Sequence, residues 1–263
     1  MSEFLVLSTV SLAIAVALFV SVWLIACRID NFSIVDIAWS YTLLPLVLWY
    51  AAAGGGDLFR KTIAVTLGGV WSLRLGTYLL RRIAKHHPHE DVRYEVLREK
   101  WKGGLGSAFF WFFQAQAVLI WLLSFPLLLA CINPAPQMNW MEWTGVAVWM
   151  LGFGGEALSD AQMARFKADP ANKGKVCRTG LWNWSRHPNY FFESVVWFGF
   201  WLFACGSPWG WVTIYAPLMI LYFLLRVTGI PLTEECAVKS KGEAYRDYQR
   251  TTSAFFPLLP RRH

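Results

Sequence analysis

The sequence predicts an all-α integral membrane protein, built as a bundle of seven transmembrane helices. Hydrophobic residues make up 56% of the 263 residues, charged residues make up only 16%, and sixteen residues are tryptophan. This composition is typical of a multi-span membrane protein and not of a soluble domain. About 20 apolar residues cross a bilayer. Seven runs with few or no charges have about that length, at 4–27, 32–53, 62–80, 108–132, 140–158, 189–205 and 209–225.

One membrane-embedded domain is expected over residues 1–263, because no internal repeat and no low-complexity linker divides the chain. The first apolar run lacks a basic leading segment and a small-residue cleavage site, so a retained span is expected there. The five cysteines show no CxxC or metal-ligand spacing. We expect them to be reduced and structural, and we expect no metal site.

The distribution of Lys and Arg predicts an outside N-terminus and a cytoplasmic C-terminus, because cytoplasmic loops retain positive charge. In this orientation only Arg60 and Lys61 fall on the outer side, whereas 81–106, 159–187 and the tail are rich in Lys and Arg. The formal charge of +7 is then mainly a topological bias. The bilayer is the expected partner, and nucleic acid is not.

Ionisable residues inside the expected spans are the first candidate site residues, since their burial is costly unless they face a partner or a cavity. Asp36 lies near the cytoplasmic end of the second span, where it could serve a ligand or form an ion pair with Arg74. Arg74, Tyr78 and Arg81 share one helix face. Two cations make a phenol a stronger hydrogen-bond donor, suited to polarising a carbonyl, although an interfacial tyrosine would also fit.

A glutamine and a glycine cluster within the expected spans could each have a structural or a functional role. Gln114, within the fourth span, either lines a pocket or bonds between helices. The glycines at 152, 154 and 155 resemble part of a dinucleotide fingerprint, but they lie inside a span with no strand before them. We therefore expect them to serve close helix packing.

The segment 86–95, HHPHEDVRYE, carries three histidines in four positions. A compact histidine cluster without spaced partners is weak evidence for zinc, so a solvated loop is the expected structure. The functional alternative is that Asp91, Arg93 and Tyr94 close over a ligand.

The segment RTGLWNWSRHPNYFFE, residues 178–193, predicts an anion site at a membrane surface. Pro188 is expected to begin a helix, so Arg186 and His187 stand just outside an N-terminus whose free N–H groups favour anions. Glu193 follows inside an apolar helix.

Two neighbouring segments extend this region. Glu156, Asp160 and Lys167 share roughly one face of the fifth span, and their side chains suit ribose, amide and phosphate groups. The amphipathic tail, residues 233–263, is expected to begin with Thr233 as N-cap. It is either a membrane-surface helix or a lid over the region.

These motifs together resemble one known family. From about Gly152 to Pro257, the patterns LSDxxxxxFK, RTGLWNWSRHPNYFFE and EExxxKxKGEAYRDYQRTTSAFFPLLP resemble the membrane-embedded steroid 5-alpha-reductase family, and the whole chain is similar to a bacterial member. The resemblance implies a seven-helix oxidoreductase in the bacterial inner membrane, with NADPH entering from the cytoplasmic side. It implies reduction of a carbon-carbon double bond conjugated to a ketone in a steroid-like lipid.

The resemblance also implies roles for individual residues. Tyr78 matches the catalytic tyrosine, and Asp36 stands with Val35 where the family has a glutamine-glutamate pair. Substrate contacts are expected from Trp39, Arg74 and Gln114. Cofactor contacts are expected from Glu156 (an asparagine in the family), Asp160, Lys167, Arg178, Arg186, His187, Asn189, Tyr190, Glu193, Arg246 and Tyr248.

An alternative enzyme class shares part of this pattern. RHPxY followed by a C-terminal EE is also similar to isoprenylcysteine carboxyl methyltransferases, which bind S-adenosylmethionine in a comparable pocket. The LSD motif at 158–160, the Tyr78–Arg81 pair and the seven spans favour a reductase. A transporter is disfavoured, because the chain shows no inverted repeat. A monomer is compatible with the sequence, which fixes neither the oligomeric state nor the natural substrate.

The loop before the sixth span favours NADPH over NADH. Its cations are Lys167, Lys173, Lys175, Arg178 and Arg186, against Asp169 as the acidic residue between 165 and 187. An additional 2′-phosphate needs cationic partners, whereas a free ribose hydroxyl is bound by a carboxylate.

Overall fold

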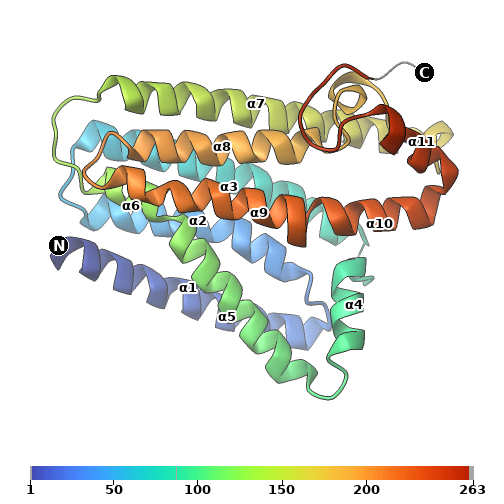
Figure 1. Cartoon of the computed structure of the whole chain (residues 1–263). Coiled ribbons are helices and arrows are strands. Elements are labelled where there is room, and N and C mark those ends of the chain that lie inside the picture. Colours follow the sequence, from blue (N-terminus) through green and yellow to red (C-terminus); the bar gives the residue numbers. More distant parts are fainter. Residues whose placement is uncertain (1, 87, 261–263) are drawn as a thin grey trace. The chain divides into compact units, whose positions relative to one another are not determined.

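The structure is a computed structural model that describes residues 2–86 and 88–260. Figure 1 colours the helices in chain order, from blue at the N-terminus to red at the C-terminus. The α-helices are α1 Ser2–Ile29, α2 Ile34–Ala53, α3 Leu58–His86, α4 Val92–Lys100, α5 Leu105–Leu123, α6 Phe125–Cys131, α7 Trp140–Ala168, α8 Pro188–Ala204, α9 Tyr215–Tyr222, α10 Ile230–Lys241 and α11 Glu243–Thr251. Short 3-10 turns at Pro170–Asn172, Gly180–Asn183 and Gly210–Ile214 and a π-turn at Phe223–Val227 complete the order.

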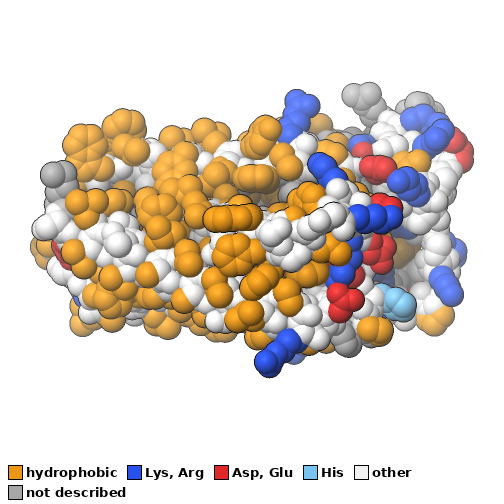
Figure 2. Space-filling model, turned by 90° about the horizontal axis from the view of Figure 1, so that it is seen from below, with side chains coloured by type: hydrophobic (Ala, Val, Ile, Leu, Met, Phe, Trp, Pro, Cys, Tyr) orange, Lys and Arg blue, Asp and Glu red, His pale blue; other side chains and the backbone are white. Residues whose placement is uncertain are grey.

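The helices confirm an all-α protein with several membrane-spanning segments. Five helical stretches are long and apolar enough to cross a bilayer: Ser2–Ile29, Ile34–Ala53, Leu58–Lys85, Leu105–Leu123 and the continuous run Gly210–Lys241. Figure 2 shows hydrophobic side chains over most of one face, with charged side chains gathered toward one end. Bands of this kind match an apolar layer beside an aqueous one.

Two expected spans, 140–158 and 189–205, fall on helices that are less apolar or shorter. α7 carries Glu142, Glu156 and Asp160 as buried charged residues, which lower its hydropathy. α8 is apolar but has 17 residues, or roughly 25 Å at 1.5 Å per residue. Seven spans and the orientation of the termini therefore stay predictions.

Three expected boundaries were wrong for local reasons. The span 108–132 is two helices, because α5 ends at Leu123 and Pro126 occupies the first turn of α6. Part of the expected loop 86–95 is helical, since Asp91 caps α4 by accepting from the Arg93 N–H. The tail helix begins at Ile230 with Pro231 in its first turn, so Thr233 lies inside α10 and not at its N-cap. Of the histidine cluster, His87 and the side chain of His86 lie outside the described residues.

The chain was expected to form one domain, but its contacts divide it into two compact units. Unit 1 comprises Met1–Trp140 with Ala204–Thr213, and unit 2 comprises Met141–Phe203 with Ile214–His263. Each unit contains candidate site residues and is described by itself.

In unit 1 the central pair is α2 and α3. The Ser72 hydroxyl donates to the Ser40 carbonyl at 2.6 Å, and the hydroxyls of Tyr41 and Thr77 are 2.9 Å apart. A side chain at Gly68 would meet Val47 and one at Gly76 would meet the Tyr41 ring, so later residues of α3 lie against earlier residues of α2 and the two helices are antiparallel. Continued by one turn, this register brings Tyr78 level with the first turn of α2.

In unit 2 helices α7 and α8 pack closely through glycines. A side chain at Gly145 would collide with Phe203, one at Gly152 with Val196, and one at Gly155 with the Phe192 ring, whereas a Cβ at Gly154 would point into open space. The packing reading is confirmed for Gly152 and Gly155, because small residues let membrane helices approach. The contacts also define an antiparallel register between the two helices (Figure 1).

Candidate functional site

In unit 1 the candidate site is centred on the Asp36 carboxylate, in the first turn of α2. The Tyr94 hydroxyl donates to Asp36 Oδ1 at 2.6 Å, and Arg93 Nη2 donates to Asp36 Oδ2 at 2.7 Å. Both donors belong to α4, in sequence 57 and 58 residues away. The ion-pair partner of Asp36 is therefore Arg93, where the sequence had suggested Arg74.

A second carboxylate links α4 to the end of α3. Asp91 Oδ1 accepts from Arg93 Nε at 3.0 Å, and its other oxygen accepts from Arg82. Burial raises the pKa of Asp91, but the hydrogen bonds and charges of Arg93 and Arg82 outweigh burial and bring it to about 2. Tyr94 is only 4% exposed, and burial and the Asp36 charge raise its pKa well above the usual value. At neutral pH Tyr94 thus keeps its proton and donates it in a hydrogen bond to the Asp36 carboxylate.

The expected substrate contacts in unit 1 lie on three helices. Trp39, on α2, packs edge-to-face against the Trp71 ring with centroids 5.9 Å apart. Arg74 and Tyr78 lie one turn apart on α3. On α5, both polar atoms of the Gln114 amide are buried and have no hydrogen-bond partner within the described residues. A bonded interhelical strut would have such a partner, so the amide is suited to a ligand or an ordered water.

In unit 2 the candidate site is centred on another carboxylate, Glu234 of α10. Glu234 Oε1 accepts from Arg186 Nε at 2.6 Å and lies 3.2 Å from His187 Nε2. Gln249 Nε2 donates to Oε2 at 2.8 Å. The two residues that precede α8 are thereby joined to both tail helices.

Arg186 and Tyr248 also hold the tail through backbone atoms. Arg186 Nη1 donates to the carbonyls of Gln249 at 3.0 Å and Thr252 at 2.5 Å. The Tyr248 hydroxyl donates to the carbonyls of Trp182 and Ser185. Arg186 and Tyr248, both expected to contact the cofactor, therefore make hydrogen bonds within the protein that join the tail to the segment before α8.

His187 is uncharged at neutral pH. Its side chain is 3% exposed, and burial lowers its pKa, although hydrogen bonding to Glu234 opposes that shift. The ring stacks on Tyr190 with centroids 5.3 Å apart, and the Tyr190 hydroxyl lies 3.2 Å from Thr233 Oγ1. Both expected cofactor residues thus contact α10 or each other.

Of the remaining polar site residues of α7 and α8, Glu156 and Asp160 are buried, whereas Asn189 and Glu193 are half-buried. Glu156 is 2% exposed and Asp160 8% exposed. The glycine register places Glu156 level with the first turn of α8, which carries Asn189, and Glu193 lies one turn further along. Asn189 Oδ1 is buried and accepts no hydrogen bond from the described residues. An orphaned acceptor on a packed helix face is a candidate ligand contact.

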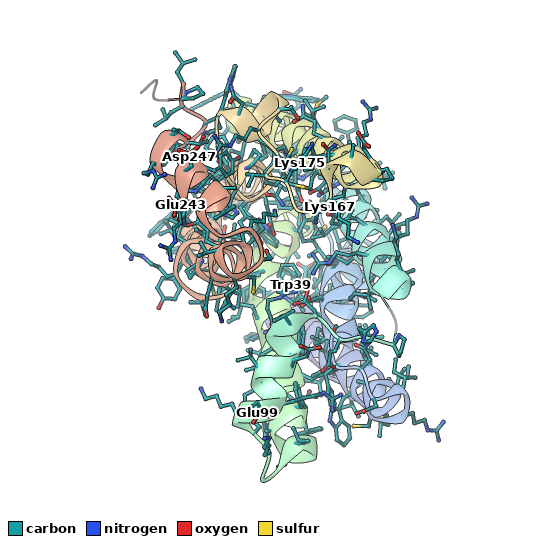
Figure 3. The ribbon with its side chains drawn as sticks, turned by 90° about the vertical axis from the view of Figure 1, so that its right-hand side faces the viewer. Trp39, Glu99, Lys167, Lys175, Glu243 and Asp247 are labelled. Atoms are coloured by element: carbon teal, nitrogen blue, oxygen red, sulfur yellow. The ribbon has the colours of Figure 1, made fainter. Side chains whose placement is uncertain are left out.

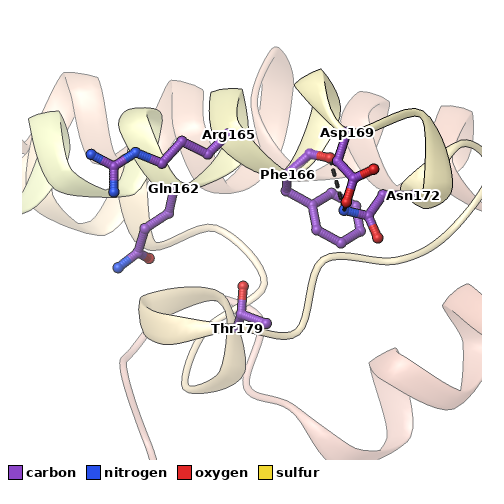
Figure 4. Close-up of a pocket in the computed structure, with 6 residues that line it drawn as sticks. All are labelled: Gln162, Arg165, Phe166, Asp169, Asn172 and Thr179. Carbon is purple, nitrogen blue, oxygen red and sulfur yellow. Dashed lines mark hydrogen bonds between the residues drawn. The ribbon is translucent and has the colours of Figure 1, made fainter.

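A pocket of about 380 Å³ lies at the C-terminal end of α7 in the same unit. Figure 4 shows its lining residues, which are Gln162, Arg165, Phe166, Asp169, Asn172 and Thr179. Asp169 Oδ1 accepts from the Ala171 N–H at 2.9 Å, and the Asn172 amide donates to the Phe166 carbonyl at 3.1 Å. The pocket combines a cation, an aromatic ring and several hydrogen-bonding groups.

Of the cations expected to bind a 2′-phosphate, two form ion pairs within the protein. Arg186 pairs with Glu234 at 2.6 Å, and Arg178 pairs with Asp247 at 2.7 Å. Lys167, Lys173 and Lys175 are exposed, as is Arg246 on α11; Figure 3 shows Lys167 and Lys175. Sequence reasoning missed Arg165, Glu234 and Gln249. The EE pair at 234–235 was a signal for Glu234, but Arg165 has none beyond its place before Lys167.

Comparison with known proteins identifies a family. No solved structure matches the chain. A protein of Schizosaccharomyces pombe named Uncharacterized protein C594.04c is 29% identical over 272 residues, covering 92% of this chain and 77% of that protein. The family model described as Protein of unknown function (DUF1295) matches residues 22–252. Because that match covers most of its length, the chain belongs to the DUF1295 family.

Proposed function

We propose that this protein is an NADPH-dependent membrane oxidoreductase that reduces a carbon-carbon double bond conjugated to a ketone in a steroid-like lipid. The observation that carries the proposal is that the α2–α3 register brings Tyr78 level with the first turn of α2, where Arg93 and Tyr94 hold the Asp36 carboxylate. The DUF1295 family is related to steroid 5-alpha-reductase-like proteins, which supports the same reaction class. In this proposal α7 and α8 also cross the membrane, and the C-terminus is cytoplasmic.

The role of Tyr78 is to donate a hydrogen bond to the substrate ketone. Reduction of an enone places negative charge on that oxygen, and a fixed donor is most effective where charge develops. Arg74, one turn away, favours this donor role by its positive charge. Asp36 holds the cytoplasmic end of α2 through Arg93 and Tyr94, so α4 becomes a positioning element for this part of the site.

A second polar group of the substrate would bind Gln114. The amide offers both a donor and an acceptor within an apolar helix, and neither has a partner among the described residues. A steroid-like lipid with a hydroxyl or ketone far from the reacting enone has a group of the right kind. An apolar pocket otherwise recognises shape more than identity.

The polar residues of unit 2 fit a dinucleotide. NADPH, when bound, supplies the hydride for the reaction. Asn189 offers an orphaned acceptor, and buried Glu156 and Asp160 suit hydroxyl or amide donors. Arg165 and the Phe166 ring, in the pocket at the end of α7, suit a phosphate and an adenine base. Glu234, Arg186 and His187 hold the tail against this region.

The test is turnover of purified protein with a Δ4-3-oxosteroid and NADPH. Loss of reduced-nicotinamide absorbance, together with a product heavier by two hydrogens, is the expected result. The joined RHPNY and Glu234 residues also favour a second candidate, an S-adenosylmethionine-dependent methyltransferase. Retention of S-adenosylmethionine by the purified protein, with no effect of NADPH, would replace the reductase by that alternative.

A further inference from the structure

Unit 2 exposes an apolar cluster beside its tail. Four side chains form this cluster, which we name the tail patch: Trp184 is 46% exposed, Phe256 61%, Leu258 59% and Leu259 83%. The neighbouring Phe255 is 6% exposed and faces inward. Exposed apolar side chains that gather in one place mark an interaction site more often than scattered ones do.

The tail patch is held in place by the backbone around it. The Leu258 N–H donates to the Trp184 carbonyl at 3.0 Å, and the Arg186 N–H donates to the Ser253 carbonyl at 2.8 Å. The Ser185 hydroxyl donates to the Phe255 carbonyl at 2.8 Å. The segment is therefore ordered before it meets a partner, which lowers the entropy cost of binding.

The position of the patch along the chain suggests its depth. Trp184 lies four residues before Pro188, the first residue of the apolar helix α8. If α8 crosses the bilayer, as proposed above, Trp184 and the segment bonded to it lie at the membrane-water interface. Tryptophan is enriched at that level, because its ring is apolar and its N–H is polar.

The backbone of the patch suits a partly dehydrated layer. Irregular backbone is costly in lipid, because unbonded N–H groups have no water to satisfy them. Pro257 and Pro260 have no N–H, and the Leu258 N–H is already bonded to Trp184. Three of the four residues 257–260 thus bring no free N–H to the interface.

An exposed apolar cluster on an ordered backbone at this level fits the boundary between the headgroups and the acyl chains. We propose that the tail patch is an interfacial anchor that inserts into the headgroup layer of the bilayer.

The test measures the depth of residue 259 in vesicles. A nitroxide is attached to Leu259→Cys in protein whose exposed cysteines, Cys27 and Cys236, are changed to Ser. Its matched control is a nitroxide at Lys239→Cys, an exposed position on α10 whose side chain is 73% accessible. Vesicles contain phosphatidylcholine, and collision with oxygen is compared with collision with a water-soluble nickel complex.

The anchor predicts more frequent collision with oxygen than with nickel at position 259 and the reverse at position 239. A label at Phe256→Cys gives a second reading if Leu259→Cys does not yield folded protein. Equal nickel collision at 259 and 239 would overturn the proposal. So would spin-spin broadening at 259 that disappears on dilution with unlabelled protein, since that result assigns the patch to a second copy of the chain.

Discussion

Each unit holds one carboxylate between an arginine and a ring-bearing residue from a distant segment. In unit 1 Asp36 is held by Arg93 and Tyr94, and in unit 2 Glu234 is held by Arg186 and His187. The Arg186–Glu234 side chains are 10% and 15% exposed, against 30% and 23% for Arg93–Asp36. The Tyr94 phenol in unit 1 keeps its proton over the whole neutral range, whereas the His187 imidazole in unit 2, whose pKa is lowered by burial, can gain a charge as the pH falls.

This difference suggests different tasks for the two clusters. The unit 1 cluster fixes a helix end beside the proposed catalytic phenol, and its Asp91 keeps its charge in mild acid because its pKa is about 2. The unit 2 cluster joins the start of α8 to α10, α11 and the segment after them, so its loss should release the tail. The predictions below separate these tasks, beginning with the largest expected effect.

Breaking the unit 2 cluster should have the greatest cost in stability. Glu234→Ala leaves the mostly buried Arg186 guanidinium without its carboxylate, and an uncompensated buried charge of this kind costs about 3 to 5 kcal/mol. Thermal unfolding in detergent should shift strongly downward. Glu235→Ala is the matched control, because its exposed pair with Lys239 contributes little. Equal shifts for the two variants would contradict the role given to Glu234.

Tyr78→Phe, in unit 1, should lower turnover and leave nucleotide binding by unit 2 unchanged. Loss of one donor to a developing oxyanion typically lowers turnover by about 100- to 1,000-fold. Nucleotide affinity should stay unchanged. Tyr41→Phe, which removes a hydroxyl bonded to Thr77, is the control and should keep most of its turnover. A Tyr78→Phe enzyme with normal turnover removes Tyr78 from the mechanism.

Asn189→Ala should weaken nucleotide binding without loss of stability. The Oδ1 atom has no protein partner in the described structure, so its removal leaves no protein hydrogen bond unmade. A lost ligand hydrogen bond is worth about 1 to 1.5 kcal/mol, or roughly 10-fold in affinity. Calorimetry with NADPH and thermal unfolding give the two readings, and Asn183→Ala is the control outside α8. Lower stability with unchanged affinity would assign Asn189 to packing.

Glu193→Ala tests the next turn of the same helix. If Glu193 contacts the nucleotide, the variant should stay folded and detergent-stable while its nucleotide retention is lost. A strut between helices would give the opposite pair of results, a lower unfolding temperature with affinity nearly intact.

Acid should loosen unit 2 before unit 1, and this is the smallest effect. The folded pKa of His187 lies below its usual 6.5, so its contribution to stability is complete above that pH and is lost as the pH falls through the lower folded value. Asp91, with a pKa of about 2 against 3.8, loses its contribution only in stronger acid. Hydrogen exchange near pH 5 should therefore rise in 252–258 and stay low in α4. Earlier exchange in α4 would reverse the comparison.

The sequence was informative about composition and helical periodicity and less so about partners. Hydropathy predicted the helical membrane class, and the glycines at 152 and 155 predicted close helix packing, because both depend on local side-chain size and polarity. The partners of Asp36 come from a helix 57 to 58 residues away, which no local pattern specifies. Arg186 looked like a free anion ligand because Glu234 is 48 residues further on, and only the fold brings the two together.

The central claim is that unit 2 binds NADPH, and titration of purified protein with NADPH, NADH and S-adenosylmethionine tests it most directly. Calorimetry at low and high salt should show NADPH binding more tightly than NADH by about 10- to 1,000-fold at low salt, since one or two charge-assisted contacts of about 1.5 to 3 kcal/mol reach the 2′-phosphate. The preference should shrink at high salt, because Arg165 and the loop lysines are exposed. Arg165→Gln should reduce it as well. Equal affinities for NADPH and NADH at low salt would refute the phosphate contact, and tight binding of S-adenosylmethionine alone would contradict the reductase.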